Sequence, residues 1–207
     1  MRRLFKKELK EFSRKYPEIV ACLPRLEAAL SAEKYVHSIG TMITAEDLMA
    51  HFTSDETLIR KAVIAGILHD CAKCMNQREA SVEYGINSAN TSGGSEEASP
   101  AVLHSIIGTF VAQQQYCIVD IEILNAIRYH TTGRANMTLL DKVIYLADSF
   151  EPARGYEDSV LNLARTKRDI DIVLLEQLEL NIKLVIQKGM PLNLDTVRAR
   201  NFLLVGE

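Results

Sequence analysis

The feature that most constrains the fold is a histidine–aspartate pair at the end of an apolar helical run. Segment 63–73 reads VIAGILHDCAK, with His69 and Asp70 at the end of a run that contains Ile64, Ile67 and Leu68. Burying the aliphatic side chains stabilises a packed helix, but burying an imidazole and a carboxylate beside them costs free energy unless both are paired. The folded chain must therefore supply a partner for His69 and Asp70.

The same pattern recurs elsewhere in the chain. His37 lies in YVHSI, His104 in VLHSII, His130 at the end of ILNAIRYH and Asp148 in VIYLADSF. Any one of them alone has an ordinary explanation, a core side chain held by one hydrogen bond. A cation bound at one point would pair with all of them, and Fe, Mn, Co, Ni and Zn accept imidazole nitrogen together with carboxylate oxygen. His51, near a polar turn, is instead expected at the surface or at a helix end.

Helical periodicity dominates the sequence and strand-like alternation is absent, so we expect an all-α fold. Segment 87–100, NSANTSGGSEEASP, is small and polar and predicts a surface loop. The expected helices are 3–15, 17–31 with a break before Pro24, 33–51, 55–74, 76–83, 101–115, 120–130, 137–149, 159–166 and 169–188.

The length and net charge of the chain limit the classes of function to consider. The chain has 207 residues, 47% of them hydrophobic, and a formal net charge of -3, which favours one globular domain without a general affinity for nucleic acid. Neither a secretory signal nor an apolar run of about 18 residues is present, so a cytoplasmic protein is expected. The first 15 residues carry seven basic and two acidic side chains, net +5. A helix docked on the domain is favoured there over one that binds an anionic surface.

Cys71 and Cys74 form a C-x-x-C pair. Such a pair can be redox-active or supply half of a zinc site. Cys22 and Cys117 are too scattered to complete a zinc site, and the context lacks the strand that a thioredoxin-like motif follows. We therefore expect reduced cysteines.

Five strings together resemble one family: KYVHS, GILHDCAK, LHSIIG, AIRYHTTGRANMTLLDKVIYLADSFEPAR and VRARN. They are similar to the YqeK family of HD-domain metal phosphohydrolases, symmetrical bis(5'-nucleosyl)-tetraphosphatases that split diadenosine tetraphosphate into two ADP. The similarity runs from about residue 17 to the end. It implies an HD-domain helical bundle over 17–207 with a metal site between helices, preceded by a basic, helical extension at 1–16.

The resemblance also implies roles for single residues. The metal ligands would be His37, His69, Asp70 and Asp148, with His104 and His130 binding a second metal or the substrate phosphates. Iron is the implied metal, with Mn, Co or Zn as alternatives, in one or two ions. The implied catalytic residues are Asp70, Lys73, His104 and His130. Segment 191–196 would line a pocket for the base or ribose.

Phosphate contacts can be chosen on chemical grounds as well. Lys73 and Arg154 can hold phosphate oxygens, and a metal-bound hydroxide would attack the polyphosphate bridge. Each candidate has an alternative explanation. Lys73 can be a solvated cation at a helix end, and Arg154 can form an ion pair with Glu151 or Asp158. Thr131, Thr132 and Gly133 can simply end a helix. The expected substrate contacts are Lys73, His104, His130, Thr131, Thr132, Arg134 and Arg154. Lys34 stands where the family commonly has Arg. Lysine keeps the positive charge but lacks the paired hydrogen-bond donors of a guanidinium group.

Other functions stay open at this point. An HD-type nucleotidase or cyclic-nucleotide phosphodiesterase would use the same scaffold, and a nucleotide-sensing module would use it without turnover. Loss of ligands is typical of such non-catalytic modules, whereas all six candidate side chains are present here. The expected ligands are a dinucleoside polyphosphate substrate and ADP or GDP as product. No specific nucleic acid and no membrane is expected as a partner, and a homodimer is the candidate assembly.

Overall fold

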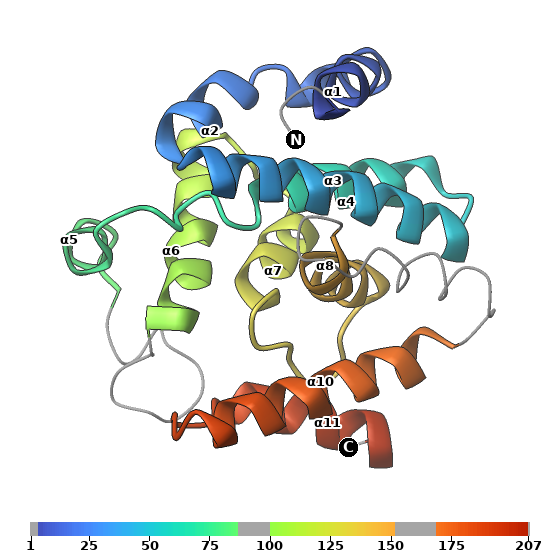
Figure 1. Cartoon of the computed structure of the whole chain (residues 1–207), viewed down its shortest axis with the longest axis vertical. Helices are drawn as coiled ribbons and strands as arrows, with labels where there is room; N and C mark the ends of the chain where they lie inside the picture. Colours follow the sequence, from blue (N-terminus) through green and yellow to red (C-terminus); the bar gives the residue numbers. More distant parts are fainter. Residues whose placement is uncertain (1–3, 87–99, 152–168, 207) are drawn as a thin grey trace.

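The computed structural model describes residues 4–86, 100–151 and 169–206. Every regular element in these ranges is a helix (Figure 1), as the all-α expectation requires. The elements are α1 (Leu4–Lys15), the 3-10 helix η1 (Pro17–Ile19), α2 (Leu23–Ala29), α3 (Ala32–Phe52), α4 (Glu56–Leu68), α5 (Gln77–Glu83), α6 (Pro100–Gln115), α7 (Ile121–Tyr129), α8 (Leu139–Phe150), α10 (Ile170–Gln187) and α11 (Leu194–Val205).

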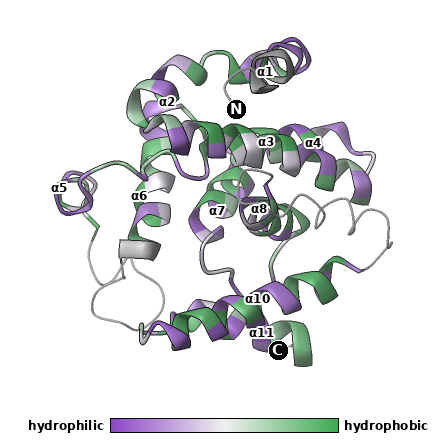
Figure 2. Ribbon diagram, in the orientation of Figure 1, coloured by the Kyte–Doolittle hydropathy of each residue, from purple (hydrophilic) through white to green (hydrophobic). Residues whose placement is uncertain are grey.

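Four helices, α3, α4, α7 and α8, form the centre of the molecule. α3 packs against α4 and α8, and α7 contacts α4, α6 and α8. α1 and α2 lie at one end of this group, and the pair α10 and α11 lies at the other, with α10 against α8 (Figure 1). α8 is mostly apolar, whereas the peripheral α5 is mostly hydrophilic (Figure 2). Met42, Leu68, Ile127 and Val143, one from each central segment, are fully buried.

Each central helix begins at a side chain that accepts hydrogen bonds from the free backbone N–H groups of the first turn. Ser31 begins α3, Asp55 begins α4, Asp120 begins α7, and Thr138 begins α8 as part of a capping box with Asp141. Such caps are each worth about 1 kcal/mol. They fix where each helix starts and thus which residues its face presents to the core.

Several predicted boundaries were wrong. The break expected before Pro24 in segment 17–31 is confirmed, however, since η1 ends at Ile19 and Pro24 stands in the first turn of α2, where its missing N–H costs nothing. The predicted helix 55–74 ends at Leu68 and continues as tight turns. Helix α11 was not predicted. The predicted helix 159–166 lies outside the described residues.

The basic N-terminal helix α1 is docked on the core. Leu9 and Phe12 pack against the core cluster, and both Lys15 and Tyr16 contact Glu46 of α3. The division into an extension at 1–16 and a domain at 17–207 stays a prediction. Among the described residues, no helix combines the length and apolarity needed to cross a membrane.

The close approach of α3 and α4 depends on Gly66. A Cβ at this position would lie 2.9 Å from Met42 Cα and 3.2 Å from Ala45 Cβ. Because backbone is in the way, we expect Gly66→Ala to destabilise the fold by about 1–3 kcal/mol. Gly108→Ala in α6 is the control, since its nearest atom would be Ile127 Cγ2 at 3.5 Å. That variant should be neutral or more stable. Equal urea midpoints for the two variants would contradict this packing.

Candidate metal centre

Five segments bring their histidine and aspartate side chains to one buried point. His37 comes from the middle of α3, the pair His69 and Asp70 follows the end of α4, and His130 follows the end of α7. His104 comes from α6 and Asp148 from the last turn of α8. The exposed fraction is at most 6% for His37, His69, Asp70, His104 and His130.

The predicted ligands form one tight group. His37 Nε2 lies 3.1 Å from His69 Nε2 and 2.9 Å from Asp148 Oδ1. Asp148 Oδ1 is 3.4 Å from His69 Nε2. Asp70 Oδ2 lies 3.9 Å from His37 Nε2 and 3.8 Å from His69 Nε2. The structure therefore brings together all four side chains of the expected metal set.

The other oxygen of Asp70 faces a second group. Asp70 Oδ1 lies 3.1 Å from His104 Nε2 and 3.5 Å from His130 Nε2, and these two nitrogens are 3.2 Å apart. Lys73 Nζ lies 2.9 Å from His104 Nε2, and Thr131 Oγ1 is 3.1 Å from His130 Nε2. Asp70 thus connects two adjacent sets of imidazoles.

Hydrogen bonds at Nδ1 determine the tautomers of His69 and His130. His69 Nδ1 lies 2.8 Å from Gly66 O and His130 Nδ1 lies 2.7 Å from Ile127 O. A carbonyl oxygen only accepts, so both rings carry a proton on Nδ1 and donate it. Their Nε2 atoms, when the rings are neutral, then present lone pairs to the centre, as a metal-ligating imidazole requires.

The charges of the site suit this arrangement. Burial raises the pKa of Asp70, but the imidazoles of His69, His104 and His130 outweigh it and hold that pKa far below its usual range. Burial lowers the pKa of His104 to about 4, although Asp70 acts in the opposite direction. At neutral pH the carboxylate is therefore ionised and the His104 ring is neutral, which are the forms that bind metals.

A divalent cation suits the donor set. Asp70 Oδ1 is buried and makes no hydrogen bond of good geometry, although His104 Nε2 is 3.1 Å away. Three trios of donor atoms lie within 4.8 Å of one another: His37, His69 and Asp70; His69, His130 and Asp148; Asp70, His104 and His130. Lone pairs gathered this closely repel one another unless positive charge lies among them.

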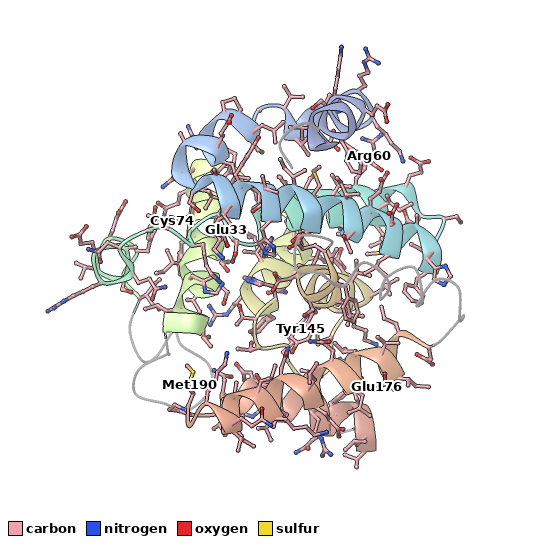
Figure 3. All side chains as sticks on the ribbon, in the orientation of Figure 1. Glu33, Arg60, Cys74, Tyr145, Glu176 and Met190 are labelled. Carbon is pink, nitrogen blue, oxygen red and sulfur yellow. The ribbon has the colours of Figure 1, made fainter. Side chains whose placement is uncertain are left out.

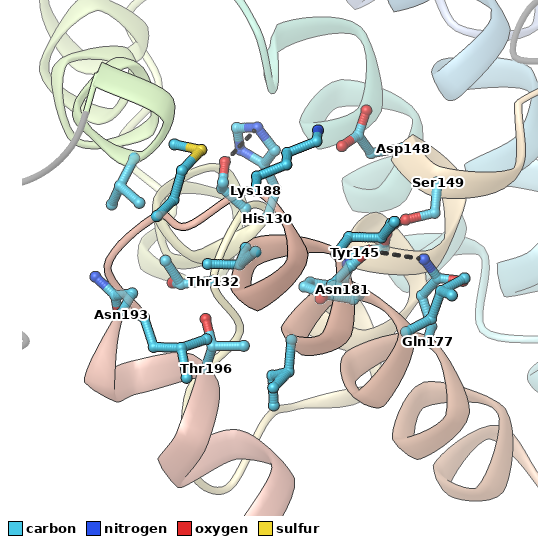
Figure 4. Close-up of a pocket in the computed structure, with 18 of the residues that line it drawn as sticks. His130, Thr132, Tyr145, Asp148, Ser149, Gln177, Asn181, Lys188, Asn193 and Thr196 are labelled. Carbon is cyan, nitrogen blue, oxygen red and sulfur yellow. Dashed lines mark hydrogen bonds between the residues drawn. The ribbon is translucent and has the colours of Figure 1, made fainter.

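A cavity of about 540 Å³ opens beside the cluster, between α8, α10 and the start of α11. His130 and Asp148 form its wall on the cluster side, together with Lys73, Thr131 and Thr132. Asn193 and Thr196 lie away from Asp148 (Figure 4), and Met190, Pro191 and Leu192 also line the cavity. The predicted segment 191–196 therefore does face the candidate site. Tyr145 lies between α8 and α10 (Figure 3), where its hydroxyl accepts a hydrogen bond of 2.7 Å from Asn181.

Other predicted residues lie elsewhere. Arg134 donates to Asp141 Oδ2 at 2.7 Å and lines a separate cavity of about 260 Å³, not the one beside the cluster. Arg154 lies outside the described residues. His51 is exposed in the last turn of α3, as expected. Cys71 is buried, Cys74 is exposed, and neither forms a disulfide.

Three residues of the site region were not found from sequence. Glu151, considered only as a partner for Arg154, is 1% exposed and its Oε1 lies 2.9 Å from His37 Nδ1. Asn181 and Lys188 of the α10 region line the cavity (Figure 4). Two signals for Glu151 were available: it is three positions after Asp148, and it lies in the quoted string that ends in LADSFEPAR. Asn181 and Lys188 carry no motif that distinguishes them from surface residues.

Comparisons with known proteins agree with this geometry. A protein-family model described as HD domain matches residues 35–153, more than half of the chain. The chain is 35% identical over 191 residues to a Bacillus subtilis (strain 168) protein named "Bis(5'-nucleosyl)-tetraphosphatase, symmetrical", covering 91% of this chain and 97% of that protein. A Halalkalibacterium halodurans protein of the same name is 33% identical over 178 residues, covering 85% and 91%.

A solved structure is also similar. The crystal structure of a Clostridium acetobutylicum protein, described as a predicted HD superfamily hydrolase involved in NAD metabolism, superposes with a TM-score of 0.73 at 35% identity. The match covers 89% of this chain and 96% of that one. The helical arrangement around the cluster is thus found in an experimental structure.

Metal binding should stabilise the fold, because the folded chain assembles donors that the unfolded chain scatters. At a free concentration 100 times the dissociation constant, a bound ion adds about 2.7 kcal/mol. For a chain of this length that raises Tm by roughly 5–10 °C. Thermal unfolding of chelator-treated protein, with and without Mn²⁺, measures the shift. His51→Ala should keep it and His69→Ala should lose it, and an equal shift in both variants would contradict the site.

Proposed function

Because the chain belongs to the HD-domain family, together with symmetrical bis(5'-nucleosyl)-tetraphosphatases, we propose that it hydrolyses dinucleoside tetraphosphates to two nucleoside diphosphates. Diadenosine tetraphosphate and water would give two ADP. The observation that carries this proposal is the buried cluster of imidazoles and carboxylates, which adjoins a cavity large enough for a nucleoside with its phosphates.

The residues of the cluster have separate tasks in this reaction. His37, His69, Asp70 and Asp148 would hold a divalent ion. When bound, such an ion lowers the pKa of coordinated water and neutralises charge on phosphate oxygens. His104 and His130, on the other side of Asp70, are positioned either for a second ion or for the phosphates.

The cations and hydroxyls at the cavity wall would orient the substrate. Lys73 Nζ, beside His104, has a half-buried side chain and is available to phosphate oxygens. Thr131 Oγ1 can donate to a further oxygen, and Lys188 adds positive charge from the end of α10. Phosphoryl transfer depends mainly on positioning and charge stabilisation, and these groups supply both. Cleavage of the central P–O–P bridge divides diadenosine tetraphosphate into two molecules of ADP.

The finer assignments are also part of the proposal. Iron, the metal that the family resemblance implies, is the proposed metal, with Mn, Co or Zn as alternatives, because imidazoles and carboxylates together suit these ions. Arg134 and Arg154 stay predicted phosphate contacts, although the Arg134 side chain pairs with Asp141 in this structure. ADP or GDP as bound product, a homodimer and a cytoplasmic location stay predictions as well.

The products of hydrolysis test the proposal directly. Diadenosine tetraphosphate should yield ADP alone, separated by anion-exchange chromatography. ATP plus AMP would contradict symmetrical cleavage. Release of inorganic phosphate from mononucleotides, or opening of cyclic nucleotides, as the faster reaction would favour the rival HD activities.

The Asp70→Ala variant should lose both metal and hydrolysis, because one side chain serves both halves of the cluster. Circular dichroism should still report a helical protein. His51→Ala, an exposed histidine, is the matched control and should retain both. Normal turnover by Asp70→Ala would show that the assignment is wrong.

The Lys73→Ala variant should keep its metal but turn over slowly. Loss of one charge-stabilising donor lowers kcat by about 10²-fold. Lys61→Ala, a lysine paired with Asp120 away from the cavity, should behave as wild type. Elemental analysis alongside kinetics checks this, and loss of metal from Lys73→Ala would contradict a role restricted to phosphate.

A further inference from the structure

Glu151 is a buried carboxylate that the reaction described above does not use. It ends α8, is 1% exposed, and its Oε1 lies 2.9 Å from His37 Nδ1. One turn earlier on the same helix, Asp148 Oδ1 lies 2.9 Å from His37 Nε2. The end of α8 therefore contacts both nitrogens of one imidazole, each through a carboxylate.

The Glu151 carboxylate packs against Gly40, where any side chain would push it aside. Gly40 lies one turn after His37 in α3, and a Cβ there would lie 2.5 Å from Glu151 Oε2 and 3.3 Å from the carboxyl carbon. All three of the nearest atoms belong to Glu151. Glycine inside a helix costs about 0.5–1 kcal/mol relative to alanine. Glycine is present despite this cost at the position next to the Glu151 carboxylate.

The contact has a specific chemical consequence for His37. A neutral imidazole that binds a metal through Nε2 carries its proton on Nδ1, and a carboxylate that accepts this proton's hydrogen bond orients the ring and makes Nε2 a stronger donor. His69 and His130 donate instead to backbone carbonyls. His37 thus differs from them in having a charged acceptor behind the ring.

We propose that Glu151 is a positioning residue of the metal centre, which holds His37 as the Nδ1-protonated tautomer and aims its Nε2 at the ion. Gly40 provides the space that this carboxylate needs. The inference rests on the metal site proposed above and adds a residue that does not itself bind the ion.

Co²⁺ titration of the chelator-treated full-length chain tests the proposal, since its visible absorption reports both affinity and ligand geometry. Glu151→Ala should bind Co²⁺ about 10–100-fold more weakly than wild type, the usual cost of removing such a partner. Glu151→Gln keeps an accepting oxygen without the charge and should lie between them. Leu146→Ala, which truncates a fully buried side chain of the hydrophobic core in α8, is the control. It should lower Tm while leaving the Co²⁺ affinity unchanged.

A double-mutant cycle separates positioning from general stability. Gly40→Ala should weaken Co²⁺ binding as Glu151→Ala does, because the new methyl group displaces the carboxylate. In the Glu151→Ala background the same change should cost nothing further, since the clashing oxygen is gone. Simple additivity of the two changes would overturn the proposed link between Gly40 and Glu151.

The remaining outcomes are also decisive. Wild-type affinity and spectrum in Glu151→Ala would overturn the inference while leaving the metal site intact. An equal loss of affinity in Leu146→Ala would also overturn it, because the effect would then follow stability alone. Absence of Co²⁺ binding by the wild-type chain would instead overturn the proposed metal site, and the inference with it.

Discussion

The candidate metal centre depends on the Asp70 carboxylate, which connects its two halves. Its two oxygens face two different sets of imidazoles, His37 and His69 on one side and His104 and His130 on the other. An ionised carboxylate inside an apolar core is unfavourable unless positive charge and hydrogen bonds compensate it. The four histidines belong to α3, the end of α4, α6 and the end of α7, so four separate parts of the chain meet at this one side chain.

Two helix ends determine where the imidazoles point. α4 and α7 both end one residue before a histidine, and each ring donates to the carbonyl three residues earlier, Gly66 O for His69 and Ile127 O for His130. In a continuing helix the Gly66 carbonyl would accept from the N–H of residue 70. Ending the helix at Leu68 releases that carbonyl for the ring. The repeated geometry explains why a histidine at each of these helix ends presents Nε2 to the centre.

Much of this could be predicted from the sequence, and the rest could not for physical reasons. The embedded histidines and aspartates predicted the cluster, because unpaired polar groups in apolar segments are costly. The end of α4 at Leu68 was missed, since apolar periodicity does not show a helix stopping to free a carbonyl. Helix α11 was missed because its residues, LDTVRARNFLLV, present no clean apolar face. The role of Glu151 depends on the space at Gly40, a contact between distant segments that no local pattern reveals.

The most direct measurement is anomalous diffraction from crystals of the protein grown with Mn²⁺. The account predicts one strong peak at bonding distance from Nε2 of His37 and His69 and from carboxylate oxygens of Asp70 and Asp148. A second peak beside His104 and His130 would mark a second ion. Fully occupied Mn²⁺ bound elsewhere, with the four side chains hydrogen-bonded among themselves, would contradict the account.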